Sequence, residues 1–150
     1  MRSTDARAAR VARYFLWALG SGLLAQGTLT LAFLAFTDRA AEVTHGMLNA
    51  DPKHGAIHVV WGLIILLMLV RRPAERVVVL LALVFGAFYS ALAVLGIVMH
   101  DPLDLQLGAG ENGFHLLIGP PALLLGCWGW WQARRPGRPL GQLARPSKSA

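Results

Sequence analysis

Four long, nearly uncharged runs alternate with short polar segments along the chain. They cover residues 14–36, 52–70, 77–99 and 113–132. A helix needs about 20 apolar residues to cross the hydrocarbon core of a bilayer, and each run has about that length. The second run reaches it only if its helix begins at Pro52, where Asp51 is a good N-cap and proline suits the first turn. The pattern therefore predicts an all-α fold, a four-helix transmembrane bundle.

Basic residues gather on one side of this predicted bundle. With four spans, the two tails and the connection between the second and third spans share one side. These three segments contain twelve of the 14 Lys and Arg residues. The positive-inside rule then predicts a multi-pass membrane protein with both termini in the cytoplasm.

The segments outside the membrane domain of residues 14–132 are short and basic. We expect residues 1–13 to form a basic cytoplasmic tail. Residues 133–150 contain several prolines and glycines, which predict a disordered tail, and its basic residues either lie on anionic lipid or serve only as a topology signal. The first span is longer than the roughly 7–15 apolar residues of a secretory signal, so we expect it to be retained as an anchor.

Composition agrees with a membrane protein. Hydrophobic residues make up 55% of the chain and charged residues 15%, whereas a soluble domain carries about a quarter charged residues. Because the net charge of +6 lies beside the apolar runs, it indicates a bilayer surface and no nucleic acid. The single cysteine, Cys127, excludes an internal disulfide and a cysteine-based zinc cluster.

A short motif recurs at the starts of the second and fourth spans. The two copies are His54-x-x-x-His58-x-x-x-Gly62 and Glu111-x-x-x-His115-x-x-x-Gly119. The recurrence predicts an internal repeat of a helical hairpin, which would place His58 and His115 near the same bilayer leaflet. In each copy the glycine lies one turn deeper than the second histidine, where it lets a neighbouring helix approach closely.

The same positions carry a resemblance to a known family. The chain keeps His54, His58 and Gly62 of an Asn-x-x-His-Asn-x-x-His-x-x-x-Gly pattern, and Asn112, His115 and Gly119 of a shorter Asn-x-x-His-x-x-x-Gly pattern. It departs from the pattern at Asp51, Gly55, Pro120 and Pro121. On these residues it resembles an uncharacterised family of bacterial, actinobacterial-type four-span membrane proteins, a domain of unknown function. The resemblance implies the four-span layout and brings no established activity.

The histidines and Glu111 are the candidate chemistry. His54 and His58 share one helical face, and Glu111 and His115 have the same spacing, so together they would offer three imidazoles and a carboxylate. That set suits Zn²⁺, Cu²⁺ or Fe²⁺. A second alternative is b-type haem with His58 and His115 as axial ligands. The third is that each histidine hydrogen-bonds to a neighbouring helix and holds no cofactor. The sequence leaves open whether His45 and His100 join the cluster.

Other polar and small residues predict packing. We expect two stripes of small or polar residues at helix contacts: Ala18, Gly22, Gln26 and Thr30 in the first span, and Ala82, Gly86 and Ser90 in the third. Pro120 and Pro121 each remove a helical N–H donor, which predicts a kink and frees two carbonyls for which Tyr89 and Ser90 are candidate partners.

No Gly-rich phosphate loop, nucleophile elbow or Ser-His-Asp arrangement is present in the sequence. The sequence therefore favours a structural or accessory role without evident catalytic activity, with the protein acting as a homodimer or as a subunit of a membrane complex. The alternative is a metal- or b-haem-binding membrane protein that uses the cluster of His54, His58, Glu111 and His115.

Overall fold

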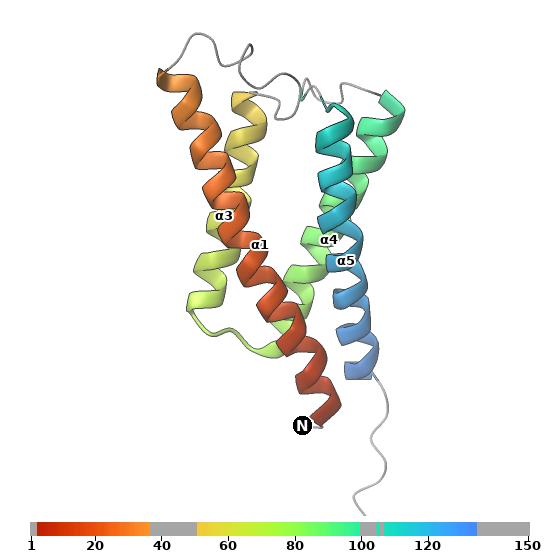
Figure 1. Ribbon diagram of the computed structural model, residues 1–150. Helices are drawn as coiled ribbons and strands as arrows, with labels where there is room; N and C mark the ends of the chain where they lie inside the picture. Colours follow the sequence, from red (N-terminus) through yellow and green to blue (C-terminus); the bar gives the residue numbers. More distant parts are fainter. Residues whose placement is uncertain (1–2, 37–50, 100–104, 106, 135–150) are drawn as a thin grey trace, which may run out of the picture.

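Four helices make up the described part of the chain. The computed structural model describes residues 3–36, 51–99, 105 and 107–134. In chain order the helices are α1 (Ser3–Phe36), α3 (Pro52–Val70), α4 (Glu75–Met99) and α5 (Ala109–Arg134). They run alternately up and down the bundle, so residues 3 and 134 lie at the same end (Figure 1). The prediction of an all-α, four-helix fold is confirmed.

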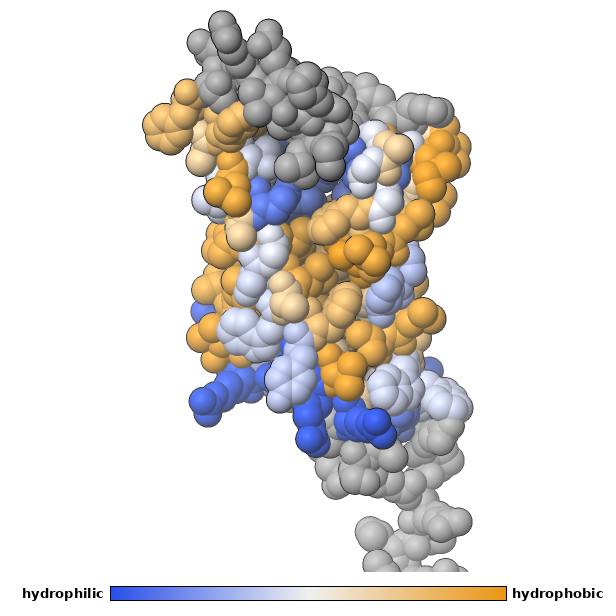
Figure 2. Space-filling view, viewed as in Figure 1, coloured by the Kyte–Doolittle hydropathy of each residue, from blue (hydrophilic) through white to orange (hydrophobic). Residues whose placement is uncertain are grey.

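Three of these helices are long and apolar enough to cross a membrane: α1 from Arg7, α3 and α4. α5 is as long, with 26 residues, but its prolines and the polar residues near its start make it less apolar. Large apolar side chains are exposed on all four helices, Phe36 to 90% and Leu117 to 71%. Figure 2 shows hydrophobic atoms as a broad band above a hydrophilic end. A surface of this kind is suited to lipid, and the chain is a membrane protein.

α1 begins well before the predicted first span. It starts at Ser3 instead of near Tyr14, so the basic segment expected as a tail is largely helical. Three alanines in this segment are buried in the bundle: Ala8, Ala9 and Ala12. Alanine has the highest helix propensity and loses no side-chain entropy when it is buried, so these residues favour the added helical turns.

α5 also begins earlier than the sequence suggests. It starts at Ala109, one turn before Gly113. The Asn112 N–H donates to the Gly108 carbonyl at 3.0 Å, and the Asn112 side chain donates to the Leu107 carbonyl at 3.2 Å. These bonds hold the first turn and offset the roughly 1 kcal/mol that a glycine costs inside a helix.

The helices pack as two pairs, α1 with α3 and α4 with α5, and α1 also contacts α4 and α5. Glycines bring the backbones together within each pair. A Cβ on Gly62 would lie 2.7 Å from the Leu24 nitrogen, and one on Gly119 would lie 2.6 Å from the Ser90 nitrogen. The predicted packing roles of Gly62 and Gly119 are therefore confirmed. The pairs correspond to the two predicted hairpins, although the internal repeat itself stays a prediction.

Pro120 and Pro121 lie inside α5, which continues past them to Arg134. The hydroxyls of Tyr89 and Ser90 are buried and have no hydrogen-bond partner among the described residues. They therefore do not satisfy the carbonyls that the two prolines free, and that prediction was wrong.

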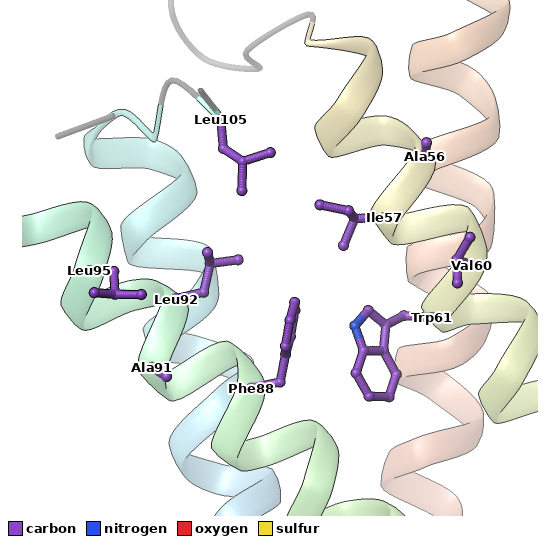
Figure 3. Close-up of a pocket in the computed structure, with 9 residues that line it drawn as sticks. All are labelled: Ala56, Ile57, Val60, Trp61, Phe88, Ala91, Leu92, Leu95 and Leu105. Carbon is purple, nitrogen blue, oxygen red and sulfur yellow. The ribbon is translucent and has the colours of Figure 1, made fainter. Parts of the chain in front are cut away.

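An apolar groove of about 490 Å³ separates α3 from α4. In Figure 3 the side chains of Ile57 and Trp61 on α3 face Phe88 and Leu92 on α4 across this groove. α3 packs mainly against α1, and it also meets α4 through Trp61, whose ring centroid lies 5.4 Å from that of Phe85 and 5.3 Å from that of Phe88. The two helix pairs therefore meet through α1, through Trp61 and through the histidines at the outer end of α3.

Candidate metal centre

The first turns of α3 supply two buried histidines. Asp51 caps the helix by accepting a hydrogen bond from the Lys53 N–H at 2.9 Å, and Pro52 takes the first helical position, as predicted. His54 and His58 lie one turn apart on the face that points into the bundle, and they are 5% and 2% exposed. Their ring centroids are 4.5 Å apart.

α5 brings a third histidine to the same place. His115 is fully buried, and its ring centroid lies 5.3 Å from that of His54 and 6.3 Å from that of His58. One turn further along α5, Gly119 abuts the α4 backbone at Ser90, and this contact sets the position of the helix. The prediction that His58 and His115 lie at the same end of the bundle is confirmed.

Most ring nitrogens of this cluster have no hydrogen-bond partner in the part of the chain that the structure describes. Nε2 of His54, Nε2 of His58 and both nitrogens of His115 are buried without a hydrogen bond to any described residue. An unsatisfied buried polar group costs about 1–3 kcal/mol. The expectation that each histidine simply bonds to a neighbouring helix therefore fails for His115, whose two nitrogens both lack a partner among the described residues.

The three rings surround a point at a distance that suits a metal ion. One ligand nitrogen can be chosen from each ring so that all three lie within 4.8 Å of one another. The ring centroids are 4.5, 5.3 and 6.3 Å apart, so one ion can lie between all three rings. Nitrogens around tetrahedral zinc are about 3.3 Å apart. The rings would have to move toward one another to reach that spacing and complete the site.

Gln26 on α1 orients His58. Its amide oxygen accepts a hydrogen bond from His58 Nδ1, and its amide nitrogen donates to Thr30 Oγ1 at 3.3 Å. With the hydrogen on Nδ1, the lone pair of His58 is on Nε2, which is buried and has no partner among the described residues. A Cβ on Gly27 would lie 2.6 Å from the Gly55 carbonyl oxygen, so this glycine lets α1 approach α3 closely. Histidines that bind metals almost always donate their other ring N–H to such an outer partner.

Gln26 is the site residue that the sequence pattern did not reveal. We placed it in a contact stripe with Ala18 and Gly22, but both are exposed, and nothing lies within 4 Å of a Cβ built on Gly22. The stripe was wrong at Ala18 and Gly22, whereas Gln26 and Thr30 do contact α3. Gln26 and Thr30 are polar and lie one turn apart within an apolar span. This pair could have indicated the site, because polar side chains within a membrane tend to face the bundle interior and to mark functional sites.

Glu111, the fourth predicted ligand, is buried at the start of α5 but does not join the close group of histidines. One of its carboxylate oxygens lies 2.9 Å from the position that a Cβ on Gly108 would take, near the beginning of the helix. The Asn112 side chain donates a hydrogen bond to the Leu107 carbonyl and so stabilises the same turn. The structure therefore brings together three of the four predicted ligands. His45 and His100 lie outside the described residues.

A haem does not fit between His58 and His115. Two axial histidines must leave room for the macrocycle between their rings. The His54 ring lies nearer to each of them than they lie to one another, so it occupies that space. The Tyr89 ring, 5.2 Å from His115 and 6.0 Å from His58, packs against the same two rings. The geometry favours a single metal ion over haem.

In comparisons with known proteins, no protein-family model, no curated protein and no solved structure matches the chain.

Proposed function

We propose that this membrane protein binds one divalent transition-metal ion, preferably zinc, through His54, His58 and His115. The observation that carries the proposal is the convergence of three buried imidazoles whose inward nitrogens lack partners among the described residues. Three imidazoles leave a fourth coordination position for water or another small ligand, the arrangement that open zinc sites have in proteins. Zinc also has no strong geometric preference, which suits ligands that come from two helices.

The metal would have a structural role in the bundle. His54 and His58 belong to the α1–α3 pair, whereas His115 belongs to the α4–α5 pair. α3 packs mainly against α1, and apart from the contacts of Trp61 an apolar groove lies between it and α4 (Figure 3). A metal bound to all three histidines would cross-link the two pairs at one end. This role agrees with the structural or accessory function expected from the sequence, whether the protein acts as a homodimer or as a subunit of a membrane complex.

The proposed location is the bacterial cytoplasmic membrane. The end of the bundle that holds Arg13, Arg71, Arg72 and Arg76 would face the cytoplasm together with both termini, in accord with the positive-inside rule. The histidine cluster lies toward the opposite end and would then be in the outer leaflet. In that leaflet the metal would be supplied from the external side of the membrane.

Metal titration of the purified protein tests the proposal. The chain is purified in detergent, stripped with a chelator and loaded with zinc or cobalt(II), and bound metal is measured by plasma mass spectrometry. We expect one ion per chain, and for cobalt the intense visible d–d absorption of a four-coordinate site. Failure of both metals to bind the folded protein would contradict the proposal and leave only an accessory role without metal.

The hydrogen bond from His58 to Gln26 gives a second test. Gln26→Ala removes the acceptor that orients the ring, and loss of such an outer partner typically weakens metal binding by about 10–100-fold. We expect a loss in that range for zinc, measured by competition with a chromophoric chelator. Thr28→Ala is the matched control, because Thr28 is an exposed polar residue on the same helix. Equal affinities of the two variants would show that Gln26 does not support the site.

Metal binding is also expected to depend on pH. The ligand form of histidine is the neutral ring, so protons compete with the metal for the same nitrogen lone pairs. Free imidazole side chains take up a proton near about pH 6.5. Because burial disfavours the charged ring, the ion should be retained at neutral and alkaline pH and released only in acid, well below about pH 6.5. Equilibrium dialysis at fixed zinc measures this, and a flat profile would argue against imidazole ligands.

A further inference from the structure

A second candidate site lies at the end of the bundle away from the histidines. A pocket of about 620 Å³ is lined by Arg13 and Trp17 of α1, by Leu69 and Val70 at the end of α3, and by Arg72 just beyond it. Figure 2 shows hydrophilic atoms below the apolar band at this end of the molecule. Two guanidinium groups therefore meet an apolar floor at the polar boundary of the membrane-spanning region.

Arg13 is held in place by the chain that follows α3. Its Nη2 donates a hydrogen bond to the Pro73 carbonyl at 2.9 Å, and the side chain is half-buried. This bond ties α1 to the α3–α4 connection. A guanidinium has five N–H donors, so a single bond to a carbonyl leaves most of the fork for another acceptor.

Arg72 adopts a backbone conformation that disfavours its own side chain. Its φ is +48°, and among the described residues it is the only non-glycine with a positive φ. Its N–H bonds to the Leu69 carbonyl at 3.0 Å and ends the helix, a position at which glycine is usual. Pro73 follows, and a residue before proline prefers an extended backbone. Strained residues of this kind concentrate at functional sites.

We propose that this pocket binds the phosphate of an anionic membrane phospholipid. The planar guanidinium fork matches phosphate oxygens and can bond two of them at once, which makes arginine better suited than lysine to this ligand. Basic pockets between transmembrane helices bind anionic head groups in the same way. The strained backbone of Arg72 places its guanidinium at the pocket that Arg13 also lines. This proposal is independent of the metal site.

The lining of the pocket distinguishes a lipid from a free phosphate ion. Leu69 and Val70 offer hydrocarbon contact to a glycerol backbone and to the first carbons of an acyl chain, and the indole of Trp17 suits the interfacial region of a bilayer. The residues described as lining the pocket include no carboxylate. A head group with a quaternary ammonium would therefore meet two like charges and no counter-charge, so phosphatidylglycerol is favoured over phosphatidylcholine.

Native mass spectrometry of the full chain in detergent tests the proposal. The protein is incubated with phosphatidylglycerol or phosphatidylcholine, and the retained lipid is counted. We expect preferential retention of phosphatidylglycerol by the wild-type protein. Arg72→Gly should weaken it about fivefold, since one arginine near the surface contributes about that much to binding anionic lipid. Because glycine accepts the φ of this position, the variant should fold at least as well as the wild type, which circular dichroism verifies.

Arg76→Gln is the matched control. It removes one positive charge from the same end of the bundle, but Arg76 is exposed and does not line the pocket. We expect this variant to retain phosphatidylglycerol as the wild type does. An equal loss in both variants would show a diffuse surface charge and overturn the site. Displacement of the lipid by an equal concentration of soluble glycerol phosphate would overturn the assignment to a membrane lipid.

Discussion

Replacing His58 with alanine is expected to abolish stoichiometric metal binding by the purified protein. The ring of His58 is nearly fully buried, and its Nε2 faces the cluster while Nδ1 bonds to Gln26. Without it two imidazoles remain, and the loss should exceed the roughly 10–100-fold effect of removing an outer partner. His115→Ala should have the same consequence, because it removes the only ligand from the α4–α5 pair. Chelator competition measures the zinc affinity of each of the two variants.

A double variant that combines His58→Ala with His115→Ala gives a stricter test. If His58 and His115 bind one ion, their effects are not additive, and the double variant should lose hardly more affinity than either single variant. Phe114→Ala is a suitable control, since its ring centroid lies 5.9 Å from that of His58 and 6.2 Å from that of His115 but offers no lone pair. A loss of metal in Phe114→Ala as large as in His58→Ala would show that the effect comes from disturbed packing.

Gly119→Leu is expected to destabilise the bundle and to weaken metal binding together. A Cβ at this position would lie 2.6 Å from the Ser90 nitrogen and 2.9 Å from the Tyr89 carbonyl carbon. Both atoms belong to the α4 backbone, so the two helices must separate. Overpacking of this kind costs about 1–3 kcal/mol or more. Because His115 lies one turn away, the same separation would carry its ring from the other two. Thermal unfolding in detergent and zinc titration report the two effects.

Gly113→Leu is the matched control for this substitution. Gly113 lies on the same helix, and nothing is within 4 Å of a Cβ built there. Leucine at this exposed helical position should be neutral or slightly stabilising, since it has a higher helix propensity than glycine. If both glycine variants unfolded at the same temperature and bound zinc equally, the contact between Gly119 and α4 would not support the site.

The helices could be predicted from the sequence because their signals are local. Apolar runs of membrane-spanning length and the Asp51-Pro52 start of α3 depend only on neighbours along the chain. The spacing of His54 and His58 likewise places two imidazoles on one face without any knowledge of the fold. The glycines one turn beyond His58 and His115 correctly indicated close helix contacts. These features, together with the recurrence of the motif at His115, account for the fold and for all three histidines of the ligand set.

The remaining features depend on how the helices meet. Gln26 reaches His58 because Gly27 lets α1 approach Gly55, a contact that no spacing within α1 encodes. Glu111 was expected as a ligand from its spacing to His115. However, side chains on a helix point back toward its N-terminus, and α5 begins just before this residue, so the carboxylate lies near Gly108 instead. The first outcome follows from a tertiary contact, and the second follows from the residue at which α5 begins.

Zinc K-edge X-ray absorption of the loaded protein tests the central claim most directly, because it reports the atoms bound to the metal. The account predicts three imidazole nitrogens at about 2.0–2.1 Å with their multiple-scattering signature, together with one further light ligand. The His115→Ala variant should lose this spectrum. A first shell without three imidazoles, such as one made of carboxylate and water oxygens alone, would contradict the assignment of His54, His58 and His115 as the metal centre.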